Sequence, residues 1–317
     1  MLPLHALVVA IDFSPSADEA LVQGAALAER SGAALHIVHA DVLFRSSGDG
    51  GPPDEAPSPS LRLRVERHVA DVLGLPAERL DALDVGGPTV AVVRDVTVPG
   101  AILRYVRAVD ADLLVLGTHG RSGLSRLLIG SVAEACVAAA PCPVLTVPHA
   151  AEPDAPSPIA PVLVAVDFSA RSRAALVAGR MLASLYRAPL ELVHVVREAG
   201  PYPSVAPGVL SVVDADPDLD LQVRNRLVRF AASMPGPPPA ALHVALGVPS
   251  RVVPALARAL GAGALVLGTH ARTGVARALI GSVAEAVLRR SPCPVLTLQA
   301  PLPAAVRRPA VRAGLPS

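Results

Sequence analysis

Short runs of aliphatic residues recur along the chain, separated by longer stretches in which apolar residues return every three or four positions. The short runs predict strands, and three of them end at a polar residue or a glycine: Asp12, His39 and Gly117. Strands that are apolar throughout are typical of a parallel sheet buried on both faces. The longer stretches, such as Leu61–Val72 and Ala101–Val109, predict amphipathic helices. The alternation predicts an α/β fold in which a doubly wound parallel sheet carries helices on both faces.

The pattern also predicts where a ligand would bind. Ser14 and Pro15 follow the first strand, as an N-cap and a first helical residue would. Ligands of doubly wound sheets bind beyond the carboxyl ends of the strands. Because Asp12, His39 and Gly117 each follow a strand, we expect them on one rim of the sheet. His39 and its later counterpart His194 should be satisfied by neighbouring backbone.

The chain contains the same unit twice. Gly117–Val147 and Gly268–Leu298 are identical at 20 of 31 positions without a gap, and the strand before Asp12 matches the strand before Asp167. A period of whole-domain length predicts tandem domains rather than a solenoid. We therefore expect two five-stranded parallel-sheet (Rossmann-like) domains in tandem, packed about a pseudo-two-fold through their last strands, Val144–Val147 and Val295–Leu298. The predicted boundaries are 1–149 for the first domain, 150–160 for a proline-rich linker, 161–300 for the second domain and 301–317 for a tail.

Composition narrows the classes of function. The 317 residues are 52% hydrophobic but only 2% aromatic, with a formal net charge of +1 and three cysteines. With no basic run or aromatic stripe, we expect no nucleic-acid partner. No apolar stretch approaches the ~18 residues that cross a membrane, so we expect no membrane partner. The sparse cysteines and the absence of a convincing signal peptide favour a cytoplasmic protein.

The first copy contains a segment suited to an anion: Gly117, two residues, Gly120, nine residues, then Gly130 and Ser131. Glycines let a backbone turn sharply and approach a bulky group. A helix beginning at Ser131 would direct N–H groups without an intrahelical partner, and the positive end of its dipole, at a phosphate. A simpler alternative is a capping box, in which Ser131 and Glu134 satisfy the helix's own N–H groups.

The combined motifs resemble the universal stress protein family. They comprise the strand ending in Asp-Phe-Ser, the histidine after the second strand, Gly-Thr-His-Gly-Arg-Ser-Gly, Gly-Ser-Val-Ala-Glu and Pro-Cys-Pro-Val-Leu-Thr. The spacing G-x2-G-x9-G-S resembles the ATP-binding branch of that family. The resemblance implies that Asp12 lies by the adenosine and that backbone at Ala40 reads the adenine edge. It further implies that the ribose and phosphates lie against Gly117, His119, Gly120, Gly130, Ser131 and Val132.

The second copy departs from this pattern at one position. The resemblance carries the site over to Asp167, Val195, Gly268, His270, Gly281, Ser282 and Val283, but Ala271 stands where the second glycine is expected. If that position needs a positive φ, alanine costs about 1 kcal/mol or more. The sequence thus predicts a weaker second site.

No catalytic residue or protein-held metal is predicted. His119 and His270 lack a paired carboxylate or second histidine, which favours a hydrogen-bonding role, and the flanking arginines could contact phosphates or lie in solvent. The leading hypothesis is a stress-response ATP-binding protein, with Mg²⁺ only as the phosphates bring it, that senses or regulates with little hydrolysis. It would act as a homodimer with an unknown regulatory partner. Two alternatives are an ATP-using adenylating or phosphoryl-transfer enzyme and a nucleotide-independent dimerisation module.

Overall fold

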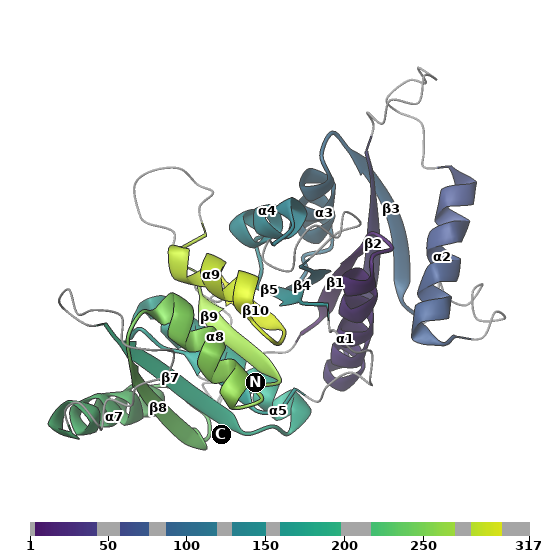
Figure 1. Ribbon diagram of the computed structural model, residues 1–317. Helices are drawn as coiled ribbons and strands as arrows, with labels where there is room; N and C mark the ends of the chain where they lie inside the picture. Colours follow the sequence, from purple (N-terminus) through teal and green to yellow (C-terminus); the bar gives the residue numbers. More distant parts are fainter. Residues whose placement is uncertain are drawn as a thin grey trace, which may run out of the picture.

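All described strands belong to one continuous sheet. The computed structural model describes residues 4–42, 58–75, 87–118, 129–149, 159–197, 217–269 and 280–299. Its ten strands run in the order β3-β2-β1-β4-β5-β10-β9-β6-β7-β8, so the second half mirrors the first across the middle of the sheet (Figure 1). Pairing within each half is parallel, which confirms two doubly wound five-stranded units in tandem.

Strands and helices alternate in both halves. The first half comprises β1 (Ala6–Ile11), α1 (Pro15–Ser31), β2 (Ala34–Val42), α2 (Pro59–Leu73), β3 (Thr89–Asp95), α3 (Val98–Ala108), β4 (Leu113–Gly117), α4 (Ser131–Ala139) and β5 (Val144–Val147). The second half comprises β6 (Val162–Ala165), α5 (Ala170–Tyr186), β7 (Leu190–Val196), α7 (Pro217–Ala232), β8 (Ala241–Leu246), α8 (Pro249–Ala259), β9 (Ala264–Gly268), α9 (Ser282–Arg290) and β10 (Val295–Leu298).

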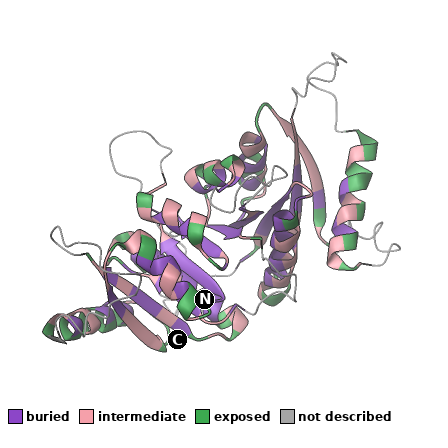
Figure 2. Ribbon diagram, viewed as in Figure 1, coloured by how far each residue is buried: buried purple, intermediate pink, exposed green. Residues whose placement is uncertain are grey.

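The sheet separates two hydrophobic layers. Successive strand residues point to opposite faces, so Leu7 and Val9 join the layer beneath α1, α2, α5 and α7, whereas Val8 and Ala10 join the layer beneath α3, α4, α8 and α9. Buried positions follow the strands and exposed ones the outward sides of the helices (Figure 2). Burial on both faces explains why the strands read as unbroken aliphatic runs.

The two halves join through their last strands, as predicted. β5 and β10 pair antiparallel, with Leu145 opposite Leu296 at the centre. The join is reciprocal: the Thr146 hydroxyl donates to the Val295 carbonyl at 3.3 Å, and the Thr297 hydroxyl donates to the Val144 carbonyl at 3.1 Å. Because the strands of each half are parallel but the join is antiparallel, the carboxyl ends of the two sets of strands lie on opposite rims of the sheet.

The first helix begins where the sequence predicts. Ser14 caps α1, accepting the Ala17 N–H at 3.3 Å, and Pro15 is the first helical residue, as predicted. Most of the predicted linker and all of the predicted tail lie outside the described residues. Within the described part of the chain, no helix combines the length and apolarity needed to cross a membrane.

Candidate functional site

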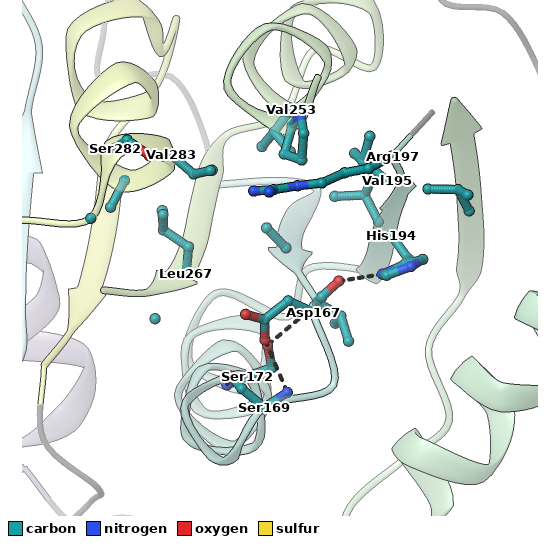
Figure 3. A pocket seen from close by; sticks show the side chains of 18 of the residues that line it. Asp167, Ser169, Ser172, His194, Val195, Arg197, Val253, Leu267, Ser282 and Val283 are labelled. Carbon is teal, nitrogen blue, oxygen red and sulfur yellow. Dashed lines mark hydrogen bonds between the residues drawn. The ribbon is translucent and has the colours of Figure 1, made fainter. Parts of the chain in front are cut away.

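A cavity of about 870 Å³ lies beyond the carboxyl ends of β6, β7 and β9, closed on one side by the first turn of α9. Six residues predicted from the second copy line it, together with further residues of the strands and helices around it (Figure 3). The predicted residues are Asp167, Val195, Gly268, Gly281, Ser282 and Val283. The others include Ser172, His194, Arg197, Val253 and Leu267. The structure therefore brings together those predicted residues of the second copy that it describes.

Asp167 is held by a tight turn at the entrance to α5. Its Oδ1 accepts the Ser169 N–H at 3.0 Å and the Ser172 hydroxyl at 2.5 Å, and Phe168 between them has a φ of 64°. An aromatic residue rarely adopts that left-handed conformation, and such strain is often found at ligand sites.

The first half repeats the turn. Asp12 Oδ1 accepts the Ser14 N–H at 3.0 Å, and Phe13 has the same φ of 64°. The helix caps are Ser14 and Ser169, so the aspartates shape the turn rather than cap the helix.

Both strand histidines are anchored to backbone, as predicted. Nδ1 of His39 donates to the Ile11 carbonyl at 2.9 Å, and Nδ1 of His194 donates to the Val166 carbonyl at 2.7 Å. Burial lowers the pKa of His194, against an opposing effect of its hydrogen bond to Val166, so the neutral ring is favoured.

The ends predicted for these two strands are wrong. β2 continues to Val42 and β7 to Val196, so Ala40 and Val195 lie inside strands. However, the register with β1 stops at the pair Ile11–His39, and the register with β6 stops at Ala165–Val193. The backbone of Ala40 and Val195 therefore passes beyond the adjacent strand, and Val195 reaches the cavity.

Gly117 and Gly268 have a packing role that sequence reasoning missed. A Cβ on Gly117 would lie 2.5 Å from Ser16 Oγ and 2.7 Å from the Ser16 carbonyl carbon. A Cβ on Gly268 would lie 2.6 Å from Arg171 Cβ. Both glycines let the end of a strand touch the first turn of a helix. The close approach of helix and strand is enough to explain why both positions are glycine, whether or not a ligand binds.

The capping-box alternative is wrong for both helices at the glycine segments. Gly130 and Gly281 are the N-caps, neither helix has a side-chain cap, and the serines Ser131 and Ser282 are first helical residues. In the first half, Gly130 also donates its N–H to the Thr118 carbonyl at 2.6 Å, which fixes the helix start, with Val132 in its first turn, beside β4. The first N–H groups of such a helix have no intrahelical acceptor and are open to a ligand.

Part of the predicted site lies outside the described residues: His119, Gly120, His270 and Ala271. The arginines that flank the two glycine segments lie there as well: Arg121, Arg126, Arg272 and Arg277. Among the described residues, no cluster of three or more histidine, cysteine or acidic side chains could hold a metal ion.

Sequence reasoning also missed Arg197, the positively charged residue that directly follows the last residue of β7. Its side chain extends across the cavity from the end of β7 toward Val283 and the start of α9 (Figure 3). Its position in the sequence could have indicated this, because it comes three residues after His194, which was itself predicted at the ligand-binding rim of the sheet.

Comparison with known proteins identifies the family of the chain. The sequence profile of the universal stress protein family matches residues 4–148 and again residues 158–299. The chain belongs to the universal stress protein family. A universal stress protein of Mycobacterium tuberculosis is 33% identical over 189 residues, which cover 59% of this chain and 61% of that protein, so the match spans less than two thirds of this relative's length.

Solved structures support the tandem fold of this universal stress protein. A universal stress protein from Archaeoglobus fulgidus superposes with a TM-score of 0.60 at 20% identity, covering 93% of this chain and 98% of its own. A protein of unknown function from Pseudomonas aeruginosa gives a TM-score of 0.63 at 20% identity, covering 94% of this chain and 93% of its own. At this identity the likeness concerns the fold alone.

Proposed function

We propose that this universal stress protein binds ATP and acts as a nucleotide-dependent regulatory or sensor protein with little or no hydrolysis. The observation that carries the proposal is the second-half cavity, in which Asp167 and the first turn of α9 face the same space between apolar walls. Its volume of about 870 Å³ falls in the range of small-molecule sites, roughly 300–1,000 Å³.

Each part of the cavity suits a part of the nucleotide. Val253 and Leu267 offer an apolar surface for a base, and the Val195 backbone lies where its edge could be read. The Asp167 carboxylate can accept from ribose hydroxyls. The N–H groups of Ser282 and Val283, at the positive end of the α9 dipole, suit phosphate oxygens. A bound triphosphate would bring Mg²⁺ with it, and the Ser282 hydroxyl is the protein group that we expect to contact the ion.

The lining favours binding over chemistry. Its described titratable groups include Asp167 and His194, which are the usual general acids and bases. Oδ1 of Asp167 already accepts from the Ser169 N–H and the Ser172 hydroxyl, and Nδ1 of His194 already donates to the Val166 carbonyl. Little or no hydrolysis, and no adenylating or phosphoryl-transfer activity, follow from this proposal.

The edge strands of the sheet bear on which surface a homodimer could use. β5 and β10, the strands that could serve a dimerisation module, pair with each other inside the chain. A homodimer would then use another surface, such as the outer edges β3 and β8. The homodimer and the regulatory protein partner stay predictions.

Calorimetric titration of the full chain with ATP and Mg²⁺ tests the proposal. We expect saturable binding that Asp167→Asn weakens, because asparagine keeps the oxygen that accepts the Ser169 N–H but removes the charge. The matched Asp12→Asn variant should weaken the equivalent contribution of the first half, and the double variant both. Absence of binding by the intact chain would overturn the proposal, and ADP released at many turnovers per minute would favour the enzyme alternative.

A further inference from the structure

The two halves carry different charges at the same place beside the site. The hydrogen bonds of His39 to Ile11 and of His194 to Val166 define equivalent positions in the two halves. Counting along the strands from these histidines, Asp41 corresponds to Val196 and Val42 corresponds to Arg197.

In the first half this rim holds an internal ion pair. Asp41 lies opposite Arg94 on β3, and Arg94 Nε donates to Asp41 Oδ2 at 2.9 Å. The second half has the apolar pair Val196 and Leu246 in the same register. The charge of the first-half arginine is therefore balanced by a carboxylate that the second half lacks.

The second half instead directs a cation into the cavity. Arg197 is exposed and lines the cavity, and it forms none of the ion pairs found among the described residues. It extends toward Val283, at the positive end of the α9 dipole (Figure 3). Two positive groups facing each other across a cavity repel, and a multiply charged anion between them removes that repulsion and gains two attractions.

We propose that Arg197 is a specificity-determining residue that makes the second-half site select nucleotides by their phosphate charge. The first-half site, where Asp41 balances Arg94, depends less on that charge. This inference rests on the proposed nucleotide binding. Ala271 predicts that the second half binds nucleotide more weakly than the first half. With Arg197 as an additional cation, the second half should instead bind a triphosphate more tightly than the first half.

Titration of the full chain with ATP, ADP, AMP and adenosine tests the inference. Asp12→Asn is included in every variant, so that the remaining heat comes mainly from the second half. Arg197→Val, which introduces the first-half residue, should weaken ATP binding about tenfold, as expected for one charge-assisted hydrogen bond in a partly exposed site. The loss should be smaller for AMP and absent for adenosine, and it should shrink as salt is raised.

Two further variants serve as controls. Arg197→Lys keeps the charge and should recover most of the ATP affinity. Arg258→Val removes another exposed arginine of the same half. Arg258 lies about 13 Å farther along α8 than Pro249, the first residue of that helix, which lines the cavity, so this variant should leave all four affinities unchanged. Melting temperatures of the Arg197 variants within about 1 °C of the parent would show that substitution at this exposed position does not alter folding.

The outcomes separate the two proposals. Unchanged ATP affinity in Arg197→Val, with normal binding by the parent, overturns the inference and leaves the proposed function standing. An equal loss for ATP and adenosine also overturns it, because Arg197 would then act through the base. No binding of any nucleotide by the intact chain overturns the proposed function itself.

Discussion

Replacing Gly117 by alanine separates two explanations of the glycine at the end of β4. The sequence interpretation assigns it to the approach of a phosphate, whereas the structure places it against the first turn of α1. The added Cβ would lie 2.5 Å from Ser16 Oγ, 2.7 Å from the Ser16 carbonyl carbon and 2.8 Å from its oxygen. Ordinary contacts of a Cβ are 3.4–4 Å. Two of the three atoms are backbone, so the helix start must move relative to the strand.

The size of the effect follows from this overlap. Overpacking of a well-packed interior costs about 1–3 kcal/mol. For a cooperative unit of 150–250 residues, each kcal/mol lowers the melting temperature by about 2–4 °C. We therefore expect Gly117→Ala to lower the melting temperature without nucleotide by roughly 3–10 °C.

Thermal unfolding followed by circular dichroism, with and without ATP, measures this effect. Gly268→Ala is the matched control: its closest contact is Arg171 Cβ at 2.6 Å, but the backbone atoms of Arg171 are 3.2 Å away or more. Its loss should be smaller. Adding Ser16→Ala to Gly117→Ala removes only the Oγ contact and should restore part of the stability. An unchanged melting temperature combined with lost ATP binding would refute the packing explanation and restore the ligand one.

Three further predictions concern buried or half-buried polar groups. Arg180 donates to the carbonyls of Ala231, Met234 and Pro235 at 2.9–3.1 Å, so Arg180→Met should lower the free energy of unfolding in urea by about 2–4 kcal/mol; a change below about 0.5 kcal/mol would show that these carbonyls are served by water. Burial raises the pKa of Cys136 and Cys142 to about 12 and that of Cys293 to about 11, although Cys142 is only half-buried. Thiolate is therefore scarce at pH 8, and the native chain should react with a disulfide reagent only in trace amounts and give three equivalents after denaturation. Fast reaction of more than one equivalent in the native chain would contradict the burial of Cys136 and Cys293. Burial also lowers the pKa of His194 in the folded chain, so the unfolded chain binds more protons, and stability should fall as the pH drops below about 6.5. The slope of melting temperature against pH should be shallower in His194→Gln, and equal slopes would refute this.

The fold could be predicted because its signals are local or repeated. Ser14 and Pro15 mark a helix start through chemistry that needs no distant partner. The repeat predicts two equal units, and equal units with matching edge strands predict the join between β5 and β10. The aliphatic runs show the strands but not their lengths: β2 passes its predicted end at His39 because β3, not β1, continues to pair with it.

The site was harder to predict because its determinants are tertiary. Whether Ser131 caps a helix or begins it depends on the dihedral angles of Gly130, which has an extended ψ of 144°. The reason for Gly117 lies in a helix that begins about a hundred residues earlier. Arg197 gains significance only when β7 and α9 face each other across one cavity.

The reciprocal join of β5 and β10 has an evolutionary consequence. Two identical subunits meeting at such an edge must carry every substitution twice, so a change that benefits one pocket is imposed on the other. Fusing the two subunits into one gene product lifts that constraint while the shared sheet still joins the two halves. Val42 and Arg197, at equivalent positions, are an example: one half of the chain can acquire a different binding specificity while the other half keeps the original one.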